Sequence, residues 1–215
     1  MSMQIQVWSD VICPWCYLGK RRLETALAGV GGDVTVTYRA FQLDPSPVPS
    51  PQPIKEALAA KFGGPERAEQ MFAHVTGIAA GDGLRLDFDR AIAANTFDAH
   101  RLVAWAAAQG RQADMVDALQ RAHFTDGIDI GSRPALAAIA GSLGLDAAAA
   151  AAYLDSDDGT ADVEADLDTA RSLGISSVPT FVIDGRYAIQ GAQEASALRE
   201  ALDEISRREA VESDR

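Results

Sequence analysis

Cys13-Pro14-Trp15-Cys16 is the stretch that decides the fold, and it contains the only two cysteines of the 215-residue chain. It follows an alternating apolar segment that predicts a strand, and it precedes a segment with helical periodicity. At such a junction, unpaired backbone N–H groups and the positive end of the helix dipole favour the thiolate form of the first cysteine. Pro14 suits the first helical turn. The position of the pair therefore indicates redox chemistry.

A structural disulfide and a zinc site are the two alternative explanations of this pair. A disulfide between cysteines so close in sequence closes a very small loop, which stabilises a fold by only about 2 kcal/mol. A zinc site needs more ligands than two thiols supply, and the remaining candidate ligands lack the close spacing of a zinc motif. Those candidates are His74, His100 and His123. We therefore expect a redox pair and no metal.

Composition and charge are those of a globular chain with a large core. The hydrophobic content is 47%, and 31 acidic residues exceed 19 basic ones, which gives a net charge of -12. This charge repels phosphate backbones and anionic membrane surfaces, so we expect no nucleic-acid or membrane partner. We find no signal-peptide pattern and no apolar run of the length that spans a bilayer. We expect a cytoplasmic protein, and two cysteines within one motif fit that reducing compartment.

The apolar pattern predicts an α/β protein interrupted by a long helical segment. Residues 5–8 and 34–43 are predicted strands on either side of the helix that follows the cysteines. Residues 44–53 alternate with prolines and predict a stiff connector. Lys20, Arg21 and Arg22 are expected on the solvated face of the first helix. Further helices are predicted at 54–62, 65–80, 96–109, 113–124, 134–143 and 146–154.

The last part of the chain returns to strands. A helix at 160–173 precedes strands at 178–183 and 186–189, and Asp184-Gly185 between them is typical of a two-residue hairpin turn. A last helix is predicted from 193 to about 207, followed by a flexible charged tail at 208–215. These patterns divide the chain into a discontinuous domain, 1–45 with 159–207, and a helical insertion domain at 54–158.

Four stretches resemble a known protein family over residues 4–202. They are Ser9-Asp10-Val11-Ile12-Cys13-Pro14-Trp15-Cys16, Phe41-Gln42-Leu43-Asp44-Pro45, Asn95-Thr96-Phe97-Asp98-Ala99-His100 and Val178-Pro179-Thr180-Phe181-Val182-Ile183. Together they resemble the DsbA-type branch of the thioredoxin superfamily, and most closely the cytosolic FrnE-like proteins associated with polyketide biosynthesis and oxidative stress. The resemblance implies an α/β thioredoxin fold with a large all-helical insertion, in which the discontinuous domain is the thioredoxin-like one.

The resemblance also implies a thiol–disulfide oxidoreductase and roles for its residues. Cys13 is expected to be the attacking, partly exposed nucleophile, and Cys16 the more buried resolving thiol. Pro179 is expected to follow a cis peptide bond and to face the cysteines. The expected substrate contacts are Pro14, Trp15, Val178, Pro179, Asn95 and His100, although a structural role is the more common one for a histidine such as His100.

No cofactor is expected beyond the Cys13–Cys16 disulfide, with glutathione as a candidate co-substrate. The expected partners are protein or small-molecule thiols and disulfides, and the expected state is a monomer or homodimer. Trp15 carries no charge that could stabilise the Cys13 thiolate, so we expect a moderate, thioredoxin-like reduction potential. Asp10 is expected to cap the helix that follows the cysteines.

Two other functions stay open at this stage. One is glutathione-dependent isomerisation or transfer on a small aromatic or polyketide molecule, because hydroxychromene-carboxylate isomerases and kappa-class glutathione transferases share the fold. Those enzymes place serine where Cys13 stands, so the sulfur here favours thiol–disulfide exchange. The other is a redox-dependent binding role within a biosynthetic complex.

Overall fold

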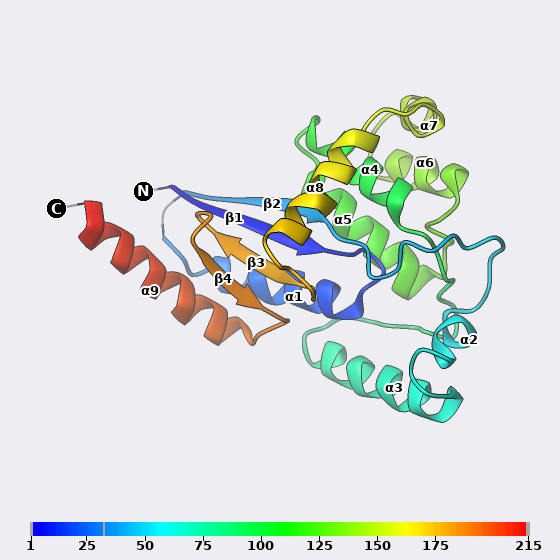
Figure 1. Cartoon of the computed structure of the whole chain (residues 1–215), viewed down its shortest axis with the longest axis horizontal. Helices are drawn as coiled ribbons and strands as arrows, with labels where there is room; N and C mark the ends of the chain where they lie inside the picture. Colours follow the sequence, from blue (N-terminus) through cyan, green and yellow to red (C-terminus); the bar gives the residue numbers. More distant parts are fainter. Residues whose placement is uncertain (1, 32, 214–215) are drawn as a thin grey trace.

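The computed structural model describes residues 2–31 and 33–213, which contain one mixed sheet of four strands (Figure 1). The strands are β1 (Ser2–Ser9), β2 (Asp33–Ala40), β3 (Thr180–Ile183) and β4 (Tyr187–Gln190). Their order in the sheet is β2-β1-β3-β4. β1 pairs in parallel with β2 and antiparallel with β3, and β3 pairs antiparallel with β4. The first strand of the chain therefore lies between partners from the two ends of the sequence.

Both faces of the sheet are covered by helices. Side chains that alternate along β1 point to opposite faces and therefore enter different cores. Ile5 shares a core with residues of α1 (Pro14–Leu27) and α9 (Ala195–Ser213), and these two helices contact each other. Trp8 points to the other face, where it packs with α8 (Thr160–Ser172). This packing holds the end of β1 in a fixed place relative to the start of α1.

A helical insertion separates β2 from α8, as the sequence predicts. Its helices are α2 (Ile54–Ala59), α3 (Pro65–Gly81), α4 (Phe97–Ala107), α5 (Gln112–Arg121), α6 (Arg133–Ser142) and α7 (Ala147–Asp155). The predicted helix at 113–124 runs beyond α5 into a π-helical turn, Ala122–Asp126. Figure 1 shows that α4–α7 and the pair α2 and α3 lie in separate groups near the end of the sheet where β1 leads into α1. The α/β fold with a helical insertion is thus confirmed.

The sequence underestimated the length of the last helix. α9 continues to Ser213, so the predicted end of this helix near residue 207 is wrong, while residues 214–215 of the expected tail lie outside the described part of the chain. The helix persists because Glu209 accepts hydrogen bonds from Arg186 and from the Tyr187 hydroxyl beside β4. In the portion of the chain that the structure describes, no helix has both the length and the apolar character needed to cross a membrane.

The hairpin between β3 and β4 is confirmed, but its loop is one residue longer than predicted. Ile183 pairs with Tyr187, which leaves a three-residue loop at 184–186. Asp184 and Gly185 adopt positive φ angles of 50° and 67°, which is the backbone geometry that their sequence favours. The Asp184 carboxylate also accepts a hydrogen bond from the backbone N–H of Gln4, so the loop is tied to β1.

Two cations of α1 are buried, although the sequence places them on its solvated face. Lys20 is 4% exposed, and its ammonium group donates to Glu24 and to Asp117 of α5. Arg22 is 6% exposed, and its guanidinium binds Asp82 and the carbonyl oxygen of Ala192. The expectation that Lys20 and Arg22 are solvent-exposed is wrong because the helical insertion supplies carboxylate partners, Asp117 and Asp82, that allow both side chains to be buried. These ion pairs connect α1 to α5 and to the residue that follows α3.

Candidate active site

Cys13 and Cys16 lie where β1 passes into α1, and both are free thiols. Cys13 occupies the position just before the first helical residue, and its backbone N–H donates to the Asp10 carbonyl oxygen at 3.0 Å. The N–H of Cys16 donates to the carbonyl oxygen of Cys13, also at 3.0 Å. Pro14 is the first helical residue, as its sequence position predicts. The Cys13 sulfur therefore lies at the positive end of the α1 dipole.

The two thiols differ in their surroundings. Cys13 is 4% exposed and Cys16 is 2% exposed, so the expectation of a partly exposed Cys13 is wrong, although its side chain borders a cavity. Burial raises the pKa of the Cys16 thiol well above its ordinary value. The hydrogen bond with Cys13 and the Cys13 charge raise this pKa further, while the backbone of Asp10 lowers it through a hydrogen bond and the Asp10 charge raises it. The Cys16 thiol therefore stays protonated in the resting protein.

Val178 and Pro179 lie opposite the start of α1. The peptide bond between them is cis, as the family resemblance implies. The Val178 carbonyl oxygen lies 4.0 Å from the Cys13 sulfur. The Pro179 ring packs so closely on α1 that a Cβ atom added at Gly19 would lie 2.7 Å from the Pro179 Cγ atom. The structure thus brings residues from the two ends of the chain together around Cys13.

A cavity of about 540 Å³ opens beside Cys13. Pro14, Trp15 and Val178 line it next to the sulfur, and the far walls come from residues 43–62, from α3 and from the segment between α3 and α4. Those walls are apolar and include Leu43, Val48, Phe62, Met71, Phe72 and Phe88. This size and lining are typical of a site for a small molecule or an apolar side chain. Sequence reasoning missed the cavity, because its apolar residues have the same pattern as the buried face of an ordinary helix.

Asn95 lies behind the cavity wall and is not among the residues that line it. Its amide nitrogen donates to the carbonyl oxygens of Pro45 and Ser46, at 3.0 and 3.1 Å. Its amide oxygen accepts from the N–H of Phe97 at the start of α4 and from the Gln42 side chain. Asn95 therefore fixes the connector to α4, and any effect on a substrate would pass through the position of that connector.

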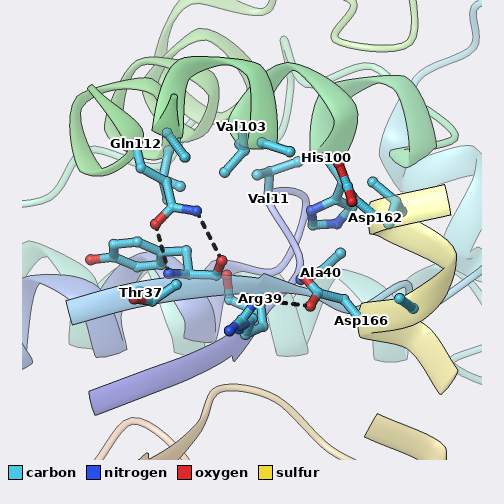
Figure 2. A pocket seen from close by; sticks show the side chains of 16 residues that line it. Val11, Thr37, Arg39, Ala40, His100, Val103, Gln112, Asp162 and Asp166 are labelled. Atoms are coloured by element: carbon cyan, nitrogen blue, oxygen red, sulfur yellow. Dashed lines mark hydrogen bonds and ion pairs between the residues drawn. The ribbon is translucent and has the colours of Figure 1, made fainter. Parts of the chain in front are cut away.

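His100 borders a different pocket, of about 320 Å³, between β2, α4 and α8 (Figure 2). Its Nε2 atom lies 3.0 Å from the Phe41 carbonyl oxygen and 3.4 Å from Oδ1 of Asp10. At the same pocket, the Gln112 side chain bonds to the N–H and the carbonyl oxygen of Tyr38 on the edge strand β2. The structure therefore assigns His100 to a buried hydrogen-bonded wall and does not bring it into the cavity beside Cys13.

Asp10 has a different role from the expected helix cap. Among the described residues, α1 has no side-chain cap, and Oδ2 of Asp10 instead accepts a hydrogen bond from the N–H of Leu43 at 2.8 Å. The carboxylate is 1% exposed, and Oδ1 faces His100. The prediction of a cap is wrong because this carboxylate binds the backbone N–H of Leu43, which lines the cavity, and not an N–H of α1. One buried acid thus links the cavity wall to the cysteines.

His123 is a second buried histidine behind the site. It lies in the π-helical turn, is 0% exposed, and its two ring nitrogens find no hydrogen-bond partner among the described residues. Burial lowers the pKa of His123 to about 4, and the negative charge of Asp10 opposes this change. Its ring meets Phe124 edge-on, and Phe124 stacks on Tyr17, the neighbour of Cys16. The imidazole is therefore neutral in the core at neutral pH.

Comparison with known proteins agrees with this geometry. A family model described as "DSBA-like thioredoxin domain" matches residues 4–203. A probable DsbA oxidoreductase from Streptomyces coelicolor is 37% identical, with a TM-score of 0.87 over 94% of this chain and 89% of that one. The cytosolic disulfide reductase DsbM from Pseudomonas aeruginosa is 25% identical, with a TM-score of 0.64 over 95% of this chain and 98% of that one. DsbM is also known in a structure with GSH.

Two further similarities are more limited. A 2-hydroxychromene-2-carboxylate isomerase has a TM-score of 0.70 over 96% of this chain and 98% of its own, but at 18% identity it shares the fold alone. The uncharacterised protein YwbO of Bacillus subtilis is 41% identical over 56 residues. That match spans 26% of this chain and only 27% of YwbO.

Proposed function

Because the chain belongs to the family of DSBA-like thioredoxin domains, we propose that it is a thiol–disulfide oxidoreductase that acts through Cys13 and Cys16. One observation carries the proposal: two free thiols with different surroundings lie at the N-terminus of α1, and one of them borders a cavity. Within the family, we propose that it belongs with the cytosolic FrnE-like members, which its sequence motifs resemble. We propose that it works in the cytoplasm, as a monomer or homodimer.

The proposed reaction begins at Cys13. Its thiolate attacks one sulfur of a substrate disulfide, a mixed disulfide forms, and the other substrate sulfur leaves as a thiolate. Cys16 then loses its proton and attacks the Cys13 sulfur, which forms the Cys13–Cys16 disulfide and releases the second substrate thiolate. Two electrons pass from the cysteine pair to the substrate. The same steps in reverse oxidise a substrate dithiol.

The order of attack follows from the surroundings of the two sulfurs. The raised pKa of Cys16 keeps it protonated and therefore a poor first nucleophile. Cys13 lies at the helix N-terminus and borders the cavity, so a substrate can reach it. We propose that Pro14, Trp15 and the Val178-Pro179 step contact the substrate around this sulfur. Asn95 and His100 then act indirectly, by holding the cavity wall.

Trapping with a Cys16→Ala variant tests this proposal. Without the resolving thiol, a mixed disulfide on Cys13 cannot be released by the protein itself, so covalent adducts should accumulate under mild oxidation and be identifiable by mass spectrometry. A Cys13→Ala variant is the matched control and should trap nothing at this site. If Cys16→Ala traps no adduct and the wild type reduces no insulin disulfide, the proposal fails.

The isomerase alternative has a separate outcome. The fold shared with 2-hydroxychromene-2-carboxylate isomerase and the apolar cavity beside residue 13 both suit a small aromatic substrate. In that case a Cys13→Ser variant would keep glutathione-dependent turnover of the small molecule, because the isomerases use serine at that position. Thiol–disulfide exchange requires instead that Cys13→Ser abolish activity.

A further inference from the structure

Two of the three described charged residues that line the cavity beside Cys13 form an ion pair. Among the described residues that line this cavity, Lys61 is the one cation, and its ammonium group forms an ion pair and hydrogen bond with Asp44. The other charged residue of the lining is the buried Asp10, which is negative when ionised. Asp44 and Lys61 are 42% and 51% exposed, so the pair lies at the solvent-exposed margin of the cavity.

The position of Asp44 is fixed by its neighbours. Its Oδ1 atom accepts a hydrogen bond from the Ser46 backbone N–H at 3.0 Å, while Oδ2 faces Lys61. The hydrogen bond from Lys61, supported by Ser46, lowers the pKa of Asp44 to about 2. The carboxylate is therefore ionised at any pH at which the protein works. The ammonium group of Lys61 is consequently paired with a carboxylate before any substrate binds.

We propose that the Asp44–Lys61 ion pair makes this cavity selective for disulfides whose substituents are uncharged and apolar, and that Asp44 is the residue that disfavours glutathione. The inference rests on the proposed thiol–disulfide exchange and names the substrate class of the same site. It concerns binding at the entrance and assigns no new chemical step. Asp44 acts as a specificity-determining residue and takes no part in the attack at Cys13.

The argument compares what the two kinds of substituent meet. Each glutathione moiety carries two carboxylates and one ammonium group and is therefore negative overall, and a carboxylate leaves water readily only when a cation or several donors replace its hydration. In this cavity the cation, Lys61, is already paired with Asp44. The carboxylates of Asp44 and Asp10 repel a further negative charge. An apolar substituent instead meets an aromatic wall, in which the rings of Phe72 and Phe88 lie 4.4 Å apart. Burial of apolar surface against such a wall is favourable.

An Asp44→Asn variant frees Lys61 and keeps the shape of the side chain. Exposed ion pairs are worth up to about 1 kcal/mol, so the freed ammonium should improve the reaction with a carboxylate substrate by about threefold to fivefold. The measurement is the second-order rate of oxidation of the reduced protein, with glutathione disulfide and with 2-hydroxyethyl disulfide, which carries no charge. The readout is the ratio of the glutathione rate to the hydroxyethyl rate.

We expect this ratio to rise about threefold to fivefold in Asp44→Asn and to return to the wild-type value in Asp44→Asn/Lys61→Gln, because the gain depends on the free ammonium group. The matched control is Asp89→Asn, which removes the same charge from an exposed residue that pairs with Lys55 outside the cavity lining. Its ratio should stay at the wild-type value. Thermal unfolding of each variant checks that the fold is kept.

Each other outcome has a defined meaning. An unchanged ratio in Asp44→Asn, or an equal rise in Asp89→Asn, overturns the specificity inference, while oxidation by 2-hydroxyethyl disulfide leaves the proposed function standing. If neither disulfide oxidises the cysteine pair in the wild type, the proposed function fails and this inference fails with it.

Discussion

His123 offers a test of the packing behind the cysteines through the pH dependence of stability. Its pKa is lowered from 6.5 to about 4 by burial, so in the folded protein it takes up a proton only near pH 4. In the unfolded chain the same side chain takes up a proton near pH 6.5. Between these two values the unfolded state binds more protons than the folded state. The free energy of unfolding therefore falls as the pH drops through this window.

The size of the loss follows from the two pKa values. Each pKa unit corresponds to about 1.4 kcal/mol, so the contribution of His123 amounts to a loss of about 3 kcal/mol once the pH has passed below about 4. A His123→Leu variant should lack this loss, because leucine does not titrate. Near neutral pH the neutral imidazole leaves two polar atoms without partners among the described residues. Leucine should therefore be neutral or stabilising there, by up to about 1 kcal/mol.

Urea unfolding at about pH 7 and at about pH 4.5 measures the effect. The stability of His123→Leu relative to wild type should increase by about 2.5 kcal/mol between these two conditions. His74→Gln, at an exposed position of α3, is the control for the loss of a histidine. Parallel pH profiles for wild type and His123→Leu would refute the reasoning. So would a loss above about 2 kcal/mol in the variant near neutral pH, since it would mean that the ring nitrogens make strong bonds.

Two further predictions concern packing and buried charge. Gly19→Ala would bring a Cβ atom to 2.7 Å from the Pro179 Cγ atom, so it should lower the free energy of unfolding by about 1–2 kcal/mol and slow oxidation of the cysteine pair. At Gly77 an added Cβ atom would meet no described atom outside its own helix within 4 Å, so Gly77→Ala should raise the free energy of unfolding by about 1 kcal/mol, as measured by thermal unfolding. Equal effects of both variants would contradict the close contact. Arg101→Leu should cost about 3–5 kcal/mol in urea, because the buried guanidinium bonds to Asp98 and to four backbone carbonyl oxygens. A loss of unfolding free energy below about 1 kcal/mol in Arg101→Leu would contradict this role of the buried guanidinium.

The features that the sequence predicted correctly depend on local chemistry. Pro14 can begin a helix because it needs no hydrogen-bond acceptor there, and Asp184-Gly185 permits the positive φ angles of the β3–β4 loop. Alternating apolar residues along β1 and helical spacing in the insertion likewise reflect the period of each element. These signals place the cysteine pair at a strand-to-helix junction without knowledge of any distant contact.

The features that it missed depend on partners far along the chain. Lys20 and Arg22 look solvated in sequence, and their burial is made tolerable by partners that include the distant carboxylates of Asp117 and Asp82. The cavity beside Cys13 is built from several segments far apart in the sequence, and no local pattern distinguishes its lining from a filled core. The burial of Cys13 has the same origin, because the segments that cover it come from elsewhere in the sequence.

Asp10 shows why some residues of this site cannot be assigned by a single substitution. Its carboxylate holds the N–H of Leu43 in the cavity wall, and its charge raises the pKa of Cys16 and opposes the lowered pKa of His123. An Asp10→Asn variant would therefore change the shape of the cavity and the acidity of the resolving thiol at the same time. The Asp44→Asn variant removes one charge from the same cavity and keeps the shape of the side chain. A change in disulfide preference that Asp10→Asn shows and Asp44→Asn lacks would therefore come from the Leu43 wall or from Cys16, and not from the loss of a charge alone.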